Sequence, residues 1–150
     1  MDKHKGLREE ATREVYLASA VNRKRTNLLL WMAQGLLAAL FIFAGAMKLV
    51  MPVEELTKQS SLSGPFLRFI GVAEVLGAIG LIVPALLRIL PILTPTAAMG
   101  LFVIMIGAIL QSVPMGPVVL IPTLTAVLTA FVAYGRTRLV PIFPKEQIYG

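Results

Sequence analysis

The sequence of 150 residues contains no cysteine and a single histidine, His4, which precedes every apolar segment of the chain. Without thiols the chain forms no disulfide, performs no thiol–disulfide exchange and ligates no iron–sulfur cluster. Because no imidazole lies in an apolar segment, the usual ligands of buried haem or copper are also missing there. We therefore expect no catalytic site, no metal site and no cofactor in the isolated chain.

Charge is scarce as well. Charged residues make up 15% of the chain and hydrophobic residues 57%, and the mean hydropathy is +0.80. A soluble domain carries about 25% charged residues. The formal net charge of +6 would also suit a protein that binds nucleic acid. However, most Lys and Arg residues flank the apolar segments, where they meet anionic lipid headgroups. The sequence thus predicts a lipid bilayer as partner and no nucleic acid.

Four long apolar runs, at residues 28–47, 69–87, 89–113 and 117–135, fill most of the sequence, and Glu74 is the one charged residue inside them. About 20 apolar residues, rising about 1.5 Å each, cross the roughly 30 Å of hydrocarbon in a bilayer. The sequence therefore predicts an all-α, integral membrane four-helix bundle over residues 28–138. The four expected spans cover about residues 28–47, 66–87, 92–113 and 117–135.

Polar segments flank the expected bundle at both ends. Residues 1–27 form a polar, basic tail in which Leu7, Ala11, Val15 and Ala18 recur at helical spacing. The segment is either a short helix on the membrane surface or a partly ordered solvated tail. Residues 139–150 form a short C-terminal tail.

The positions of the basic residues predict the orientation in the membrane. If all four runs span, eleven of the 14 Lys and Arg residues lie on the side of the two termini, and three lie on the opposite side. Loops rich in Lys and Arg face the cytoplasm. We therefore expect a multi-pass membrane protein with both termini in the cytoplasm.

Glu74 is the most informative residue of the expected bundle. A carboxylate inside a span costs about 2.5–3.5 kcal/mol, so it normally faces the bundle and finds a partner. Helical side chains tilt toward their own N-terminus, which aims Glu74 at the outer face, where Lys48 ends the first span. The predicted polar cluster consists of Lys48, Arg68, Glu74 and Gln111. It is either a structural ion pair that locks two helices or an outward-opening pocket for a proton, an ion or a quinone-like headgroup.

Four segments carry a resemblance to a known family. They are FAGAMKL at 43–49, RFIGVAEVLGAIGLIVP at 68–84, LTP at 93–95 and FVAYGR at 131–136. In this order and spacing, over about residues 28–138, the chain resembles the DoxX-like family. The resemblance implies a four-helix protein of the bacterial inner membrane. The motif lysine, arginine and glutamate of the family match Lys48, Arg68 and Glu74, while Gln111 stands where several relatives carry histidine.

The resemblance also implies a setting for the function. Relatives occur with a terminal quinol oxidase, with thiosulfate:quinone oxidoreductase and in oxidative-stress membrane complexes. We expect a non-catalytic accessory or assembly subunit with a membrane or redox-complex protein as partner. The alternative is a protein that binds or transfers a small lipophilic, quinone-like ligand through an outward-facing pocket at Lys48 and Glu74. An enzyme acting alone ranks third, because no set of catalytic groups converges.

Overall fold

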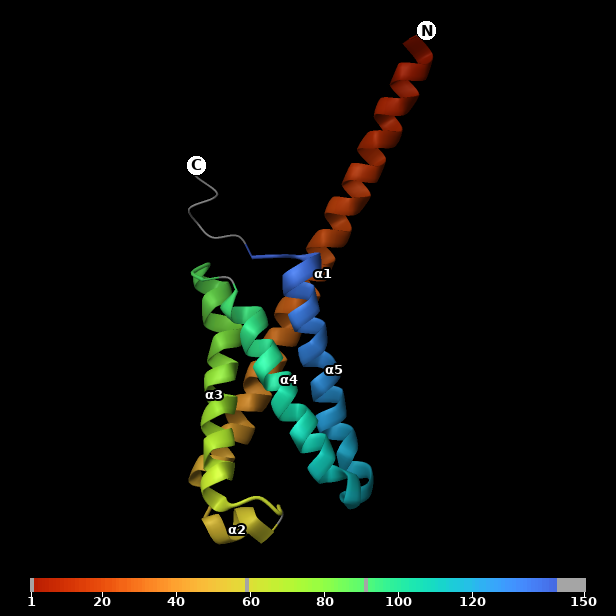
Figure 1. Ribbon diagram of the computed structural model, residues 1–150. Helices are drawn as coiled ribbons and strands as arrows, with labels where there is room; N and C mark the ends of the chain where they lie inside the picture. The colour runs from red at the N-terminus through yellow and green to blue at the C-terminus, as the bar shows by residue number, and fades with distance from the viewer. Residues whose placement is uncertain (1, 59, 91, 143–150) are drawn as a thin grey trace.

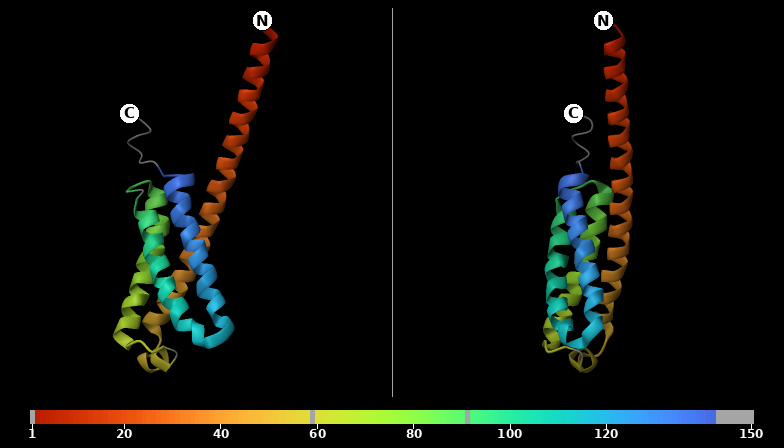
Figure 2. Two further views of the ribbon diagram at one scale, coloured as in Figure 1. Left: turned by 45° about the vertical axis from the view of Figure 1, so that its right-hand side comes forward. Right: turned by 90° about the vertical axis from the view of Figure 1, so that its right-hand side faces the viewer.

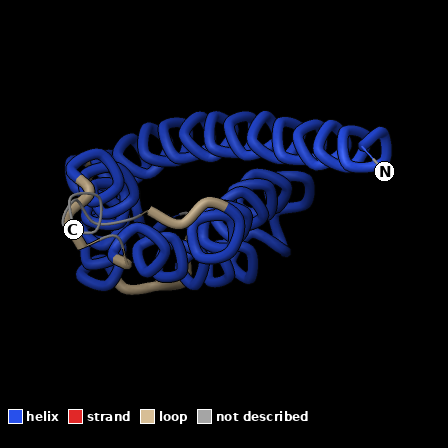
Figure 3. The backbone as a smooth tube through the Cα atoms, turned by 90° about the horizontal axis from the view of Figure 1, so that it is seen from above, coloured by secondary structure: helices blue, strands red, loops and turns tan. Residues whose placement is uncertain are grey.

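The computed structural model of the chain describes residues 2–58, 60–90 and 92–142, with side chains from residue 6 onward. Every regular element in these ranges is a helix, and no strand occurs in them (Figure 3). The elements are α1 (Asp2–Val50), α2 (Val53–Lys58), α3 (Gly64–Leu87), α4 (Leu93–Ser112), η1 (Val113–Val119), α5 (Leu120–Tyr134) and η2 (Gly135–Leu139). The expected all-α class is confirmed.

The long helices run alternately up and down (Figure 1). Three helical stretches are long and apolar enough to cross a membrane, namely Gly6–Val50, Gly64–Leu87 and Leu93–Leu139. The third stretch reverses at Gly116, whose φ of 68° and ψ of −130° break the helix. The fourth helix begins at Leu120 rather than at the expected residue 117, because Pro114, Gly116 and Pro117 occupy the reversal. The chain therefore forms a bundle of four antiparallel helices.

Helix α1 continues without a break from the polar tail into the first expected span. Its 49 residues have a length of about 73 Å at 1.5 Å per residue. Residues 6–19 are exposed, and this part of α1 projects past the other helices (Figures 1 and 2). A helix lying flat on the membrane would need a bend near residues 25–28. The structure instead continues the polar segment along the axis of the span.

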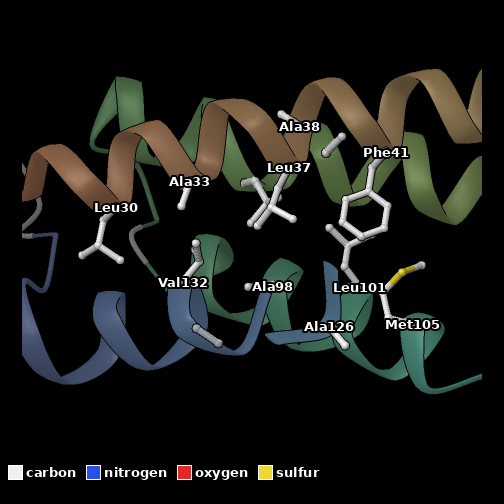
Figure 4. Close-up of a cluster of buried hydrophobic side chains, with 13 residues drawn as sticks. Leu30, Ala33, Leu37, Ala38, Phe41, Ala98, Leu101, Met105, Ala126 and Val132 are labelled. Atoms are coloured by element: carbon white, nitrogen blue, oxygen red, sulfur yellow. The ribbon is translucent and has the colours of Figure 1, made fainter. Parts of the chain in front are cut away.

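The bundle encloses a narrow apolar core between α1 and the α4–α5 hairpin. Helix α3 packs against both α1 and α4, and α4 packs against α5. The core residues Leu30, Leu37, Phe41, Leu101 and Val132 are at most 1% exposed (Figure 4). Even with these core residues included, only between 28% and 39% of the most apolar window of each spanning stretch is buried. Most of the apolar surface thus faces outward, as an integral membrane protein in lipid requires.

Candidate functional site

Lys48 and Glu74 form an ion pair between α1 and α3. The Lys48 ammonium donates to both carboxylate oxygens, with an Nζ–Oε2 distance of 2.7 Å and an Nζ–Oε1 distance of 3.0 Å. The Glu74 side chain is 2% exposed, whereas 27% of the Lys48 side chain is exposed. The carboxylate is therefore enclosed by protein, and the lysine stem forms the outer edge of the pair.

Helix geometry explains why these two side chains meet. Lys48 follows Gly45 by one turn of α1, and Glu74 follows Gly71 by one turn of α3. The two glycines face each other where the helices cross: a Cβ on Gly71 would lie 3.0 Å from the Lys48 Cβ, and one on Gly45 would lie 3.3 Å from the Glu74 Cβ. Because each side chain leans toward the N-terminus of its own helix, antiparallel helices direct the two side chains toward each other.

Arg68 belongs to the same end of the bundle but has a different partner. Its Nη2 atom donates to the backbone oxygen of Met51 over 2.8 Å. Met51 directly follows α1, so the guanidinium satisfies a carbonyl group that the end of the helix leaves free. Arg68 thus joins the second turn of α3 to the end of α1, and no hydrogen bond between it and Glu74 occurs among the described residues.

Gln111 is the member of the predicted cluster that the structure places elsewhere. It lies in the last turn of α4, next to the η1 reversal. This reversal lies apart from the α2–α3 end in Figure 1 and in the left view of Figure 2. In the part of the chain that the structure describes, no hydrogen bond connects Gln111 with Lys48, Arg68 or Glu74. The predicted four-residue cluster therefore reduces to the pair and its neighbour Arg68.

A second polar cluster lies at the other end of the bundle, and sequence reasoning did not identify it. The Arg136 Nε atom donates to Gln34 Oε1 over 2.7 Å, and its Nη1 atom donates to Asn27 Oδ1 over 2.9 Å. The Gln34 amide in turn donates to the backbone oxygen of Leu81 over 2.5 Å. The Arg136 guanidinium also lies over the ring of Trp31, with Cζ 5.2 Å from the ring centroid. These contacts connect α1, α3 and η2.

The local backbone turns Arg136 into the bundle. The η2 segment is a π-helical turn in which the Val140 amide donates to the Gly135 oxygen over 2.8 Å. Single π turns are uncommon and occur frequently at functional sites. Gly135 packs against Leu30 so closely that a Cβ at position 135 would overlap that side chain. The one signal in the sequence was the spacing of Asn27 and Gln34, which are two helical turns apart and so share a face of α1.

The two buried charges differ in how they are compensated. Glu74 has a lysine, whereas Arg136, which is 4% exposed, has only neutral partners among the described residues. Its Nη2 atom is buried and makes no hydrogen bond there. Amide oxygens orient a guanidinium but do not neutralise its charge. The second cluster is thus an incompletely satisfied cationic site.

The described bundle contains few side chains that could bind a metal ion. Within residues 6–58, 60–90 and 92–142, no three His, Cys, Asp or Glu side chains gather in a way that would hold a metal ion. The side chain of His4 lies outside the described residues. The polar groups that the structure brings together are suited to ion pairing and hydrogen bonding.

Comparison with known proteins places the bundle in a family. A model of the DoxX-like family matches residues 32–135, which is more than half of the chain. The match confirms the resemblance seen in the sequence. It includes Lys48, Glu74 and Gln34 and ends one residue before Arg136. No curated protein and no solved structure gives a significant match.

Proposed function

Because this chain belongs to the DoxX-like family of membrane proteins, we propose that it is a non-catalytic accessory or assembly subunit of a membrane complex with quinone-linked redox chemistry. The family supplies the redox setting, as an expectation from the resemblance. The structure supplies the argument for a subunit that acts through contact with another protein.

The observation that carries this proposal is the projecting N-terminal part of α1. Residues 6–19 are exposed throughout, including Leu7, Val15 and Tyr16 at 58%, 70% and 72%. An isolated helix of this length is marginal in water, because most helical stability in proteins comes from packing against other elements. A helix that extends from the bundle without such packing gains stability when it docks on a partner. This supports a role in assembly.

The embedded polar groups favour the same role. Both oxygens of the Glu74 carboxylate accept hydrogen bonds from Lys48, so the pair joins α1 to α3. Gln34 and Arg136 join three elements at the opposite end. A proton relay needs a chain of titratable groups. One carboxylate that is held by its own lysine is better suited to fixing the helices.

The test is stoichiometric recovery of a partner from native membranes in mild detergent. The full chain should bring down a membrane protein that carries a redox group. Leu7 and Val15 lie about 80° apart around the axis of α1, whereas Tyr16 lies about 180° from Leu7 and about 100° from Val15, outside that stripe. Leu7→Ser with Val15→Ser should reduce recovery at least tenfold without changing the thermal stability of the bundle, while Tyr16→Ser should retain it. Recovery that all variants share equally would refute docking through this face.

A second proposed function is the binding of a small quinone-like ligand at Lys48 and Glu74. One observation favours it: 27% of the Lys48 side chain is exposed, and an ammonium has three donors. A ligand carbonyl can accept from the exposed side of Lys48 while Glu74 stays paired. Decylubiquinone should then raise the melting temperature of the wild type but not that of Lys48→Met. Equal effects on both proteins would argue against this pocket.

A further inference from the structure

Arg136 is a buried cation without a counter-ion in the described part of the chain. The two ion pairs there are Lys48–Glu74 and Lys58–Glu55, and neither involves η2. A buried charge is normally paired, because its transfer from water is otherwise costly. The guanidinium is fixed on two sides by Gln34 and Asn27, while Nη2 makes no hydrogen bond. The site thus has a definite geometry, a free Nη2 group with two N–H donors and an uncompensated positive charge.

The surroundings of Arg136 indicate where a counter-ion enters. Trp31 lies against the guanidinium and is itself only half-buried, so its indole separates the cation from the outer surface of the bundle. The neighbouring helix contributes Thr94, whose hydroxyl is also buried without a hydrogen bond, and α4 contacts η2. The two unpartnered buried polar atoms of the described residues therefore occur in adjoining elements.

We propose that Arg136, Gln34 and Asn27 form a binding site for one phosphate group, which Trp31 covers. Guanidinium binds phosphate through charge-assisted hydrogen bonds, and its planar fork matches the phosphate oxygens. The site lies at the end of the fourth span, at the depth where a bundle meets lipid headgroups. The phosphate belongs either to an anionic phospholipid or to a free anion of the same chemistry. In both cases it supplies the negative charge that the described residues lack.

The chain offers a direct reporter for this site, because Trp31 is its only tryptophan. Titration of the purified full chain with phosphatidylglycerol in mixed micelles should change the Trp31 emission. Phosphatidylcholine is the matched neutral lipid. The loss of charge-assisted hydrogen bonds corresponds to about tenfold to a hundredfold in affinity. The wild type should therefore prefer phosphatidylglycerol by at least tenfold.

Two variants separate a specific site from general attraction to negative charge. Arg136→Gln should lose the preference, because it removes the cation and keeps a polar side chain. Arg138→Gln removes the same charge from the exposed end of η2 and should retain the preference. Should Arg136→Gln fail to fold, native mass spectrometry of the wild type decides: one retained phosphatidylglycerol per chain supports the proposal.

A titration with inorganic phosphate distinguishes whether the bound phosphate group belongs to a phospholipid or to a free anion. Competition between millimolar phosphate and phosphatidylglycerol identifies the shared phosphate chemistry, and a response to the lipid alone assigns the ligand to the bilayer. The proposal is overturned if neither probe changes the Trp31 emission and no lipid is retained, or if Arg136→Gln keeps the wild-type preference. The sequence also offers Glu146 of the C-terminal tail as a possible counter-ion. If that carboxylate paired with Arg136, the preference for phosphatidylglycerol would appear only in Glu146→Gln, and this result would also overturn the proposal. Loss of a protein partner leaves this titration unchanged, so the site is tested independently of the accessory role.

Discussion

Gly45 of α1 and Gly71 of α3 face each other so closely that a Cβ on Gly45 would lie 2.7 Å from the backbone oxygen of Gly71. Lipid tails are as apolar as the helices, so helices in a membrane associate through close packing and interhelical hydrogen bonds. The glycine contact permits the close approach that brings Lys48 and Glu74 within hydrogen-bond distance. The ion pair and the crossing therefore form one structural unit.

The close crossing of α1 and α3 predicts that one added methyl group at Gly45 lowers the stability of the bundle. Gly45→Ala should destabilise the bundle by about 1–3 kcal/mol, because overpacking forces the two backbones apart. Gly100 on α4 has no atom near its expected Cβ, so Gly100→Ala should be neutral or stabilise by up to about 1 kcal/mol through helix propensity. Unfolding of both variants in detergent measures the difference. Similar responses at the two positions would show that the crossing does not depend on Gly45.

The ion pair predicts an asymmetric double-mutant cycle. Lys48→Met should cost about 3–5 kcal/mol, because it leaves the enclosed Glu74 carboxylate without a partner. Glu74→Gln should cost less, since it removes the buried charge while the Lys48 ammonium extends to the headgroups. The double variant should recover much of the stability that Lys48→Met loses.

Thermal unfolding of the two single variants and the double variant measures this coupling. Lys58→Met is a suitable control, because the exposed Lys58–Glu55 pair is worth about 0–1 kcal/mol. Strictly additive losses would mean that Lys48 and Glu74 do not interact in the protein.

The sequence indicated the fold and one of the two polar clusters for separate physical reasons. Apolar run length is a local property, so α3, α4 and α5 could be located within a few residues, whereas the start of α1 at Asp2 could not. The meeting of Lys48 and Glu74 follows from side-chain tilt and antiparallel neighbours, which a sequence also indicates. A functional role of Glu74, as part of a binding pocket, stays a prediction.

The remaining features depend on the three-dimensional path of the chain. The predicted association of Gln111 with Glu74 assumed that all outer helix ends converge, whereas the α4–α5 reversal lies apart from the α2–α3 end (Figure 1). Arg136 was considered only as a basic residue that flanks a span and as the last residue of the FVAYGR segment. Its burial depends on a π turn and on the contact of Gly135 with Leu30, and neither has a periodic signal in the sequence.

The distribution of basic residues predicts which side each loop faces. We expect a cysteine at position 58, the last residue of α2, to react with a membrane-impermeant thiol reagent in whole cells. A cysteine at position 137, in η2, should react only after the cells are opened. The absence of native cysteine removes any background from the chain. The reverse pattern would place both termini outside and contradict the orientation.

Gln34 and Gln111 provide a matched pair of amides for testing the second polar cluster. Gln34 is fully buried and bonds both Arg136 and the Leu81 oxygen, whereas Gln111 is half-buried at the end of α4. Gln34→Leu keeps a similar volume but leaves a guanidinium N–H and a backbone oxygen without that partner. An unsatisfied buried group costs about 1–3 kcal/mol, so this variant should be destabilised by at least that amount.

Gln111→Leu should change the stability by less than about 0.5 kcal/mol, as is usual for sites outside such networks. Chemical unfolding of both variants in the same detergent gives the comparison, and Trp31 emission should shift in Gln34→Leu alone. A Gln34→Leu variant as stable as Gln111→Leu would show that the amide does not connect η2 to α3.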